Sequence, residues 1–300
     1  MTEESKKAKV KIALPHRLDA ILFEYGLAKD NDVELVVDLP HRAADLLAHR
    51  VVDCALVPSV MYFQGDYMIV PDVAVSTYVQ MGSELLVSKK PLPEVRSVAF
   101  PNQPDTSRTM LEIALRELFP EIPYRFEIGV GNPHTDLERC DGAVISGEGA
   151  FGLPEGLHKY DVGEFWVRIT ELPAVFSLFL VSADMPLERR NEIYARVIKA
   201  KQTGLAQSDK VVRMAQERVT LNRYRLIEYL TVNLDYDLFS RQVKSLKLLG
   251  EYMADYKLIP DDRRKELEFA THRSHVSLFE EVFGVGTAED ASLDELFSDE

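Results

Sequence analysis

Cysteine is scarce in this chain, and apolar runs long enough to cross a membrane are absent. The 300 residues include two cysteines, Cys54 and Cys140, each beside an aspartate at a predicted strand. We interpret both as buried thiols, because a disulfide or a metal site needs further partners or an oxidising compartment. The longest apolar stretch, 172–181, is interrupted by Pro173 and falls short of the roughly 20 residues of a membrane-spanning helix. We therefore expect no membrane segment.

The signatures of several enzyme classes are missing as well. The seven histidines include no HExxH pattern and no Cys/His cluster, so we expect no metal site. The chain has no GxGxxG after a strand, no GxxxxGK(S/T) and no GxSxG, which argues against a nucleotide cofactor and against a serine hydrolase. We expect no cofactor. The N-terminal segment is charged and has no apolar signal-peptide core, which predicts a cytoplasmic protein.

Positive charge is in short supply. The chain has 35 lysines and arginines against 49 acids, and its formal net charge is −14. A nucleic-acid-binding protein needs a basic surface, so we expect no nucleic acid partner. Eight of the acids follow Arg273, after which no further lysine or arginine occurs, so an anionic ligand remains compatible with the rest of the chain. We predict that residues 284–300 form a disordered acidic tail.

The alternation of short apolar segments with helical patterns predicts an α/β fold, and before residue 60 it indicates a mostly parallel sheet. The predicted strands are 9–14, 33–37, 52–57, 84–88, 97–100, 124–128, 142–146 and 173–182. Helical spacing of apolar residues is found at 18–28, 43–48, 108–118, 187–206, 208–219, 221–233, 235–256 and 261–282.

Two strand ends indicate two lobes that face one cleft. VDCALVPS at 52–59 and DGAVISGEGA at 141–150 are apolar strands that deliver hydroxyls, N–H groups or a carboxylate to their C-terminal ends. In open α/β sheets, ligands bind at that end of the strands. The sequence therefore predicts a small-molecule ligand between two lobes.

We predict a first lobe of residues 1–87 together with 180–283, which adds the C-terminal helices. The second lobe covers residues 88–179. Crossover strands near 84–88 and 176–182 would form the hinge, and closure of the lobes would bury a small ligand. The sequence leaves the oligomeric state open, and a homodimer is compatible with it.

The helix that opens at PDTSRT is a candidate anion site. Ser107, Arg108 and Thr109 offer hydroxyls and a cation at a positive helix end, which suits a carboxylate. The same residues equally suit an ordinary helix cap. Asp105 opposes an anion here unless its side chain points away.

Other candidate ligand contacts also follow strands. Arg17 suits bidentate pairing with a substrate carboxylate, or it is a solvated residue at a helix start. Ser59 either caps the next helix or contacts the ligand, and Ser83 has a similar pair of interpretations. Gly147 allows close backbone approach, which makes Glu148 a cleft carboxylate, with a surface turn as the alternative.

The ordered set of motifs resembles the chorismate dehydratases of the futalosine route to menaquinone. That family shares its fold with type II periplasmic binding proteins. The resemblance implies a two-lobed α/β fold around a central cleft and a lyase that removes water from chorismate or a related cyclic carboxylate. The matching segments, in family order from about residue 10 to 182, are RLDAILFEYGL, LPHRAADLLAHRVVDCALVPSVMY, VPDVAV, ELLVSKKPL, VAFPNQPDTSRTMLEIAL, DGAVISGEGA and YDVGEFWVRITELPAVFSLFLVS.

The resemblance also implies roles for single residues. The Ser-Arg-Thr at 107–109 matches the family's Ser-Arg-Thr-Ser loop, with Met110 in place of the last serine, and would hold a substrate carboxylate. Ser59 and Ser83 would hydrogen-bond the substrate. Asp19 stands where the family usually has asparagine, and it would act as base or proton donor.

This chain departs from the family at several positions. The family's Ile-Gly-Asp appears as Ser-Gly-Glu at 146–148, and its Gly-Pro-Val is replaced by VQMGSE. Asp19 adds negative charge near the expected cleft, which opposes the binding of a dianion such as chorismate. These changes support a rival hypothesis, a non-catalytic binding protein or sensor that uses the same cleft. A third hypothesis is a partner-binding scaffold that uses the acidic amphipathic tail.

Overall fold

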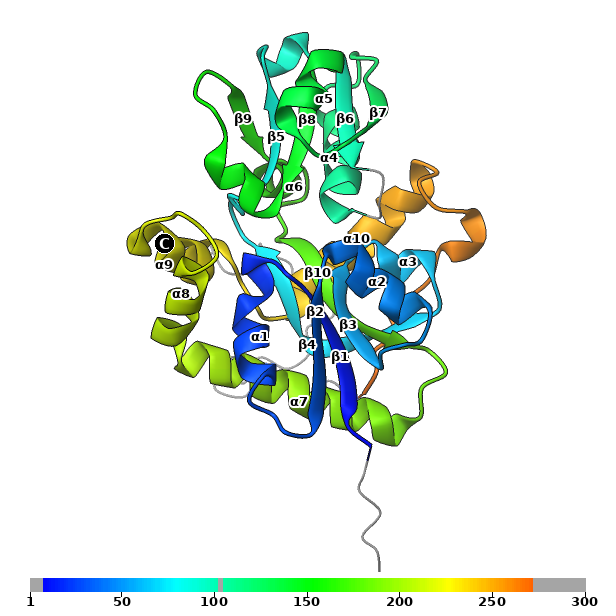
Figure 1. Ribbon diagram of the computed structural model, residues 1–300. Coiled ribbons are helices and arrows are strands. Elements are labelled where there is room, and N and C mark those ends of the chain that lie inside the picture. The colour runs from blue at the N-terminus through cyan, green and yellow to red at the C-terminus, as the bar shows by residue number, and fades with distance from the viewer. Residues whose placement is uncertain (1–7, 102–104, 272–300) are drawn as a thin grey trace, which may run out of the picture.

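The computed structural model describes residues 8–101 and 105–271, and it confirms the α/β fold class. Two sheets form the centres of two lobes, one above the other (Figure 1). The first sheet has the order β2 (Val33–Asp38), β1 (Val10–Pro15), β3 (Cys54–Pro58), β10 (Ala174–Ser182) and β4 (Tyr67–Thr77). The second has the order β7 (Arg125–Gly129), β6 (Ser97–Pro101), β8 (Gly142–Ser146), β5 (Glu84–Ser88) and β9 (His158–Asp161).

Each sheet contains both parallel and antiparallel strand pairs. In the first sheet, β1 runs parallel to β2 and β3, as the early strand–helix alternation predicts. In that sheet β10 is antiparallel to both β3 and β4. In the second sheet, β6 is parallel to β7 and β8, while β5 is antiparallel to β8 and β9. The carboxyl ends of the parallel strands β1 and β3 therefore face the second lobe.

The chain crosses between the lobes twice. It leaves the first sheet after β4 and enters the second at β5, and it returns from α6 into β10. All of β5 thus lies in the second sheet, and all of β10 lies in the first. The crossings fall at 78–83 and 171–173. The strands predicted at 84–88 and 142–146 are confirmed residue by residue.

The helices before β10 pack against the two sheets. Their bounds are η1 (Leu18–Ala20), α1 (Ile21–Leu27), α2 (Pro40–Ala48), α3 (Met61–Gln64), η2 (Leu92–Glu94), α4 (Thr106–Leu118), α5 (Pro133–Arg139), η3 (Gly147–Gly152) and α6 (Val162–Thr170). Short polar side chains define where several of them begin. Asp105 caps α4, Asn132 caps α5 and Asp161 caps α6, in each case by accepting backbone N–H groups of the first turn.

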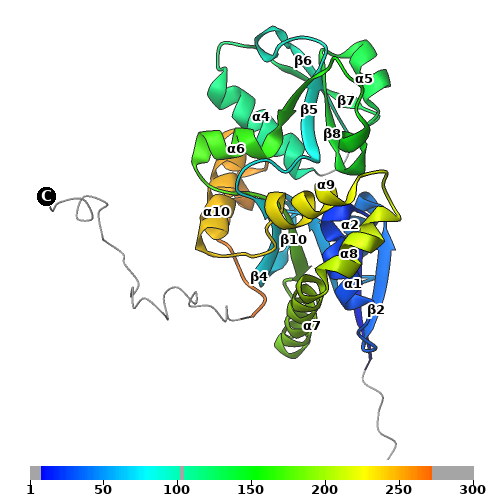
Figure 2. The same cartoon turned by 90° about the vertical axis from the view of Figure 1, so that its left-hand side faces the viewer.

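The C-terminal part of the described chain is helical and reaches both lobes. Its elements are α7 (Leu187–Ala206), α8 (Ser208–Gln216), α9 (Arg223–Glu228), the π-helical turn η4 (Tyr229–Asn233), α10 (Ser240–Asp255) and η5 (Asp261–Arg263). Figure 2 shows α8 beside α1 with α9 above it, near the second lobe. The ring of Tyr229 meets Phe151 of the second lobe edge-on, with centroids 5.2 Å apart. No described helix is both long and apolar enough to cross a membrane.

The helix predicted for 261–282 is wrong over its described part. Only the short turn η5 is helical there, and residues 268–270 pair with β4 instead. Ile69 donates its N–H to the carbonyl of Glu268 at 2.9 Å, and Ala270 donates to the carbonyl of Ile69 at 2.8 Å. Backbone hydrogen bonds to β4, the edge strand of the first sheet, therefore outweigh the helical spacing of the apolar residues. Residues 272–282, and the tail at 284–300 with its scaffold hypothesis, lie outside the described residues.

Two glycines set the close packing of α1 against α7. A Cβ at Gly26 would lie 2.2 Å from the carbonyl oxygen of Ala200, and a Cβ at Gly204 would lie 2.5 Å from that of Leu22. Both obstacles are backbone atoms, which cannot rotate away. A larger residue therefore forces the two helices apart.

Gly26→Ala is expected to lower the free energy of unfolding by about 2 kcal/mol. Overpacking of a buried contact costs ~1–3 kcal/mol, and the better helix propensity of alanine returns only part of this. Urea unfolding measures the loss. Gly152→Ala is the matched control, because no heavy atom lies within 4 Å of its added Cβ. Equal stability of the two variants would contradict the close packing.

Candidate functional site

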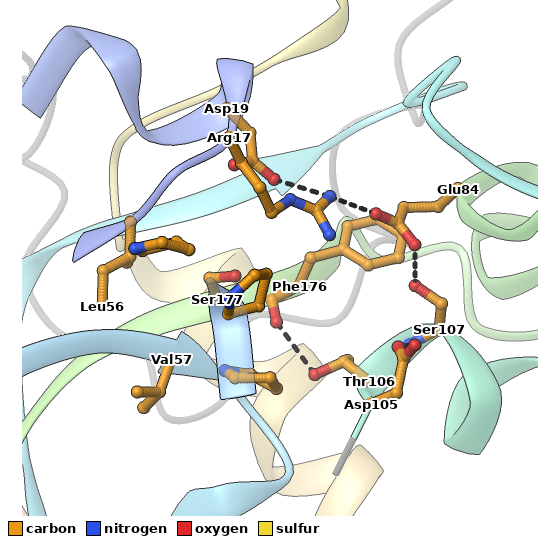
Figure 3. Close-up of a pocket in the computed structure, with 13 residues that line it drawn as sticks. Arg17, Asp19, Leu56, Val57, Glu84, Asp105, Thr106, Ser107, Phe176 and Ser177 are labelled. Carbon is orange, nitrogen blue, oxygen red and sulfur yellow. Dashed lines mark hydrogen bonds and ion pairs between the residues drawn. The ribbon is translucent and has the colours of Figure 1, made fainter. Parts of the chain in front are cut away.

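A cavity lies between the two lobes, where the ends of β1 and β3 face the start of α4. It has a volume of about 40 Å³ and is partly open to solvent. Its wall combines Pro15 and Pro58 from the first lobe, residues 105–107 from the second, and Phe176 of β10. Figure 3 shows the polar part of this wall. The charged side chains there are Arg17, Asp19, Glu84 and Asp105.

Arg17 and Asp19 come from the turn between β1 and α1. The Nη2 atom of Arg17 lies 2.9 Å from Oδ2 of Asp19, whose side chain is 4% exposed. Burial raises the pKa of Asp19 above its ordinary value. The guanidinium of Arg17 opposes this shift, while Glu84 and Glu148 add to it. A raised pKa is typical of carboxyl groups that take part in acid–base chemistry.

Glu84, the first residue of β5, connects three parts of the site. One carboxylate oxygen accepts from the guanidinium of Arg17, and the other accepts from the hydroxyl of Ser107. Figure 3 shows Arg17 between Asp19 and Glu84, with Ser107 beyond the Glu84 carboxylate. Glu84 thus joins a cation of the first lobe to the start of α4 in the second. Our sequence analysis did not single out this residue.

The start of α4 is occupied by Asp105. Its Oδ1 accepts the backbone N–H of Ser107 at 2.8 Å, and its Oδ2 accepts from the hydroxyl of Ser146 at 3.4 Å. Burial and the nearby Glu84 carboxylate raise the pKa of Asp105 to about 6. The candidate anion site at this helix start is therefore already filled by the protein's own carboxylates. The side chain of Asp105 does not point away, as an anion here would require.

Arg108 and Thr109 do not line the cavity. The guanidinium of Arg108 lies over the ring of Phe100, 5.3 Å from its centroid. The hydroxyl of Thr109 donates to the carbonyl of Asp105 one turn earlier, at 3.2 Å. Of the predicted Ser-Arg-Thr set, the structure brings only Ser107 into the wall of the cavity.

Ser59 and Ser83 are buried and bonded within the protein. The hydroxyl of Ser59 donates to the carbonyl of Val175 at 2.8 Å, which ties β3 to β10. The hydroxyl of Ser83 lies 2.9 Å from that of Tyr229, in the C-terminal helical region. Neither serine lines the cavity. Ser59 thus joins two strands of the first sheet, and Ser83 joins the first crossover to the C-terminal helical region.

Gly147 and Glu148 lie against the β1–α1 turn from the second lobe. A carboxylate oxygen of Glu148 accepts the backbone N–H of Leu18. Gly147 has a φ of +76°, and a Cβ there would lie 3.7 Å from Cζ of Arg17. The positive φ favours glycine, and its small size keeps the backbone beside the guanidinium. Glu148 thus holds the backbone of the β1–α1 turn, and Gly147 lies beside Arg17, both outside the cavity wall.

The fold and site together define a class of protein. In protein AF1704 from Archaeoglobus fulgidus the fold recurs with a TM-score of 0.71 at 17% identity, over 85% of this chain and 100% of that one. It also recurs in the periplasmic aliphatic sulphonate binding protein SsuA from Escherichia coli, with a TM-score of 0.60 at 12% identity, over 90% of this chain and 99% of that one. The predicted two-lobed, periplasmic-binding-protein-like fold is confirmed.

The sequence assigns the chain to one family within this fold class. Residues 10–255 match a family described as menaquinone biosynthesis. The protein therefore belongs to this menaquinone-biosynthesis family, and the resemblance drawn from its motifs is confirmed. The match extends through α10, well beyond residue 182, where the motifs of the sequence analysis end.

Proposed function

We propose that this protein is a dehydratase of menaquinone biosynthesis that removes water from chorismate or a related cyclic carboxylate. One observation carries the proposal: a buried carboxyl group, Asp19, lies beside Arg17 in the cavity between the lobes. Its raised pKa suits proton transfer. Membership of the menaquinone-biosynthesis family supports the choice of pathway.

In the proposed reaction, Asp19 is the base. With chorismate, it takes the proton from the ring carbon that carries the enol ether. The electron pair of that C–H bond forms a ring double bond, and the hydroxyl on the neighbouring carbon leaves as water. The ring becomes aromatic, which supplies driving force, so the protein mainly has to orient the ring and handle the protons.

Asp105 is the proposed acid. It is the second carboxyl group with a raised pKa in the cavity wall, and in its protonated form it donates to the departing hydroxyl. Arg17 holds Asp19 in position through the 2.9 Å contact. Exchange with solvent afterwards restores the proton on Asp105 and removes the one on Asp19.

Incubation of the purified protein with chorismate tests the proposed function. We expect a change in ultraviolet absorbance and a product lighter than chorismate by one water in mass spectrometry. Consumption of chorismate without an aromatic product would contradict it. No turnover of chorismate or of related cyclic carboxylates would equally remove it.

The pH profile provides a further prediction. If Asp105 must be protonated, kcat falls as the pH rises through about 6, because the acid then loses its proton. Asp105→Asn keeps an acceptor for the N–H of Ser107 but cannot donate an acidic proton. This variant should have a lower kcat that no longer declines across that range. An unchanged alkaline decline in the variant would assign the acid to another group.

A second candidate function is a non-catalytic binding protein or sensor. One observation favours it: among the described residues of the cavity wall, three carboxyl groups surround a single guanidinium. Such a site suits an amine or a hydroxyl-rich ligand. A thermal shift with such a molecule, without turnover of any cyclic carboxylate and with loss of binding in Asp19→Asn, would establish this alternative.

A further inference from the structure

Glu84 fills a position that a ligand carboxylate would otherwise take. Its side chain is 3% exposed, and both of its oxygens are engaged. Oε1 meets the guanidinium of Arg17, and Oε2 meets the hydroxyl of Ser107. A guanidinium, a hydroxyl and the start of a helix are the groups that typically bind a carboxylate. Here a carboxylate of the protein binds them.

The hydrogen-bond donors in the first turn of α4 are also bonded to groups of the protein. Ser107 gives its hydroxyl to Glu84 and its backbone N–H to Asp105. Thr106 gives its hydroxyl to the carbonyl of Phe176 at 2.8 Å. The first turn of α4 therefore has neither its side-chain hydroxyls nor the N–H of Ser107 free for a ligand carboxylate.

The charges near the start of α4 also oppose the binding of a ligand carboxylate there. Arg17 carries the only positive charge among the described residues of the cavity wall, and Asp19 and Glu84 both pair with it. A ligand carboxylate placed beside Ser107 would meet Glu84 and Asp105 at close range. Like charges brought together in a buried site oppose binding. A ligand hydroxyl, in contrast, could donate to either carboxylate.

One N–H group of Arg17 has no partner. Its Nε–H is buried and makes no hydrogen bond in the described structure. A Cβ added at Gly147 would lie 3.8 Å from this Nε, so the glycine leaves space beside the N–H. A buried donor without a partner favours an acceptor supplied by a ligand. A single ligand carboxylate on Arg17 would satisfy it.

We propose that Glu84 is a specificity-determining residue. Its carboxylate takes the place of one ligand carboxylate at the end of the cavity next to α4. The cavity therefore selects cyclic ligands that carry one carboxylate and place a hydroxyl at that end. The inference rests on the proposed function in one respect, that the ligand of this cavity is a cyclic carboxylate. It narrows that ligand to a monocarboxylate, and it makes a dicarboxylate such as chorismate a poorer one.

Two meta-substituted benzoates test the inference by isothermal titration calorimetry at neutral pH. In meta-hydroxybenzoate the group meta to the carboxylate is a hydroxyl, whereas in isophthalate it is a second, larger carboxylate. Comparison with a Glu84 variant therefore separates the effect of charge from that of size. Wild-type protein is expected to bind meta-hydroxybenzoate at least about tenfold more tightly than isophthalate. Glu84→Gln keeps the size of the side chain and removes its charge. It should reduce this ratio by about tenfold, mainly through tighter binding of isophthalate.

Glu155→Gln is the matched control. It removes the same charge from an exposed position in the same lobe, outside the cavity wall, and should leave the ratio as in the wild type. Isophthalate binding as tightly as meta-hydroxybenzoate to the wild type would overturn the inference. An unchanged ratio in Glu84→Gln would also overturn it. If that variant does not fold, Glu84→Ala, which also removes the charge, replaces it in the test.

The result also separates the inference from the proposed function. Discrimination that depends on Glu84, without turnover of any cyclic carboxylate, would keep the inference and remove the dehydratase. Turnover of chorismate without this discrimination would keep the dehydratase and remove the inference. If neither probe binds to the wild type or to Glu84→Gln, the inference falls, and turnover of chorismate decides the dehydratase separately.

Discussion

Replacing Asp19 by alanine is expected to lower kcat for the proposed dehydration at least about 100-fold, since a positioned general base typically contributes 10²–10⁴-fold. The carboxyl group of Asp19 is buried in the cavity wall and held by Arg17 at 2.9 Å. Alanine removes the group that would accept the ring proton, and nothing else in the side chain can replace it. KM should change less than kcat, because the loss concerns the transition state.

The measurement compares steady-state kinetics of Asp19→Ala with those of the wild type. Arg17 keeps Glu84 as a partner in the variant, so a folded protein is expected, which circular dichroism can check. Asp45→Ala serves as the control, because Asp45 lies exposed on α2, away from the cavity wall. A kcat of Asp19→Ala within a few-fold of the wild-type value would contradict the role of base.

Short apolar segments predicted most strands well and missed β4 and β9. The strand β4 was missed because its sequence, YMIVPDVAVST, contains proline and aspartate, which normally argue against a strand. Here Pro71 and Asp72 lie in the middle of the strand, and Asp72 has a φ of +65°. The pairing of β4 with β10 shifts register twice along its length. Long-range pairing with β10 thus holds a strand that its own sequence does not favour.

The site could be predicted in position but not in its internal bonds. The rule that ligands lie at strand ends indicated Arg17, and the family resemblance indicated Asp19 and Ser107; all three line one cavity in the structure. The actual partners of the serines come from distant parts of the chain: Ser59 bonds to Val175, and Ser83 bonds to Tyr229. Sequence spacing contains no signal for such partners.

Glu84 is the clearest residue that sequence reasoning missed. A charged residue at the first position of a strand normally faces solvent, so it attracted no interpretation. The signal was its place in ELLVS, a segment otherwise read as buried, directly after a serine that was already a candidate. Whether such a carboxylate faces water or a guanidinium depends on how the second lobe meets the first, which only the structure gives.

Asp161→Ala is expected to cause the largest loss of stability, about 4 kcal/mol, because one buried carboxylate satisfies four backbone donors. Its oxygens accept from the N–H groups of Met81 at 3.1 Å, Gly82 at 2.7 Å, Gly163 at 2.8 Å and Glu164 at 3.3 Å. Each buried donor left without a partner costs ~1–3 kcal/mol. Water entering the space left by the side chain would recover part of this sum.

The position of Asp161 gives the variant a second effect. Met81 and Gly82 belong to the crossover that leads directly to Glu84, so the same carboxylate fixes the start of α6 and one connection between the lobes. Urea unfolding measures the stability, with Asn132→Ala as the control. Asn132 caps α5 through two N–H groups at an exposed site, and its loss should cost only about 1 kcal/mol. If the two variants lose equal stability, Asp161 acts as a helix cap alone. A larger loss in Asp161→Ala, with weaker ligand binding in the folded fraction, would show that it also fixes the crossover that carries Glu84.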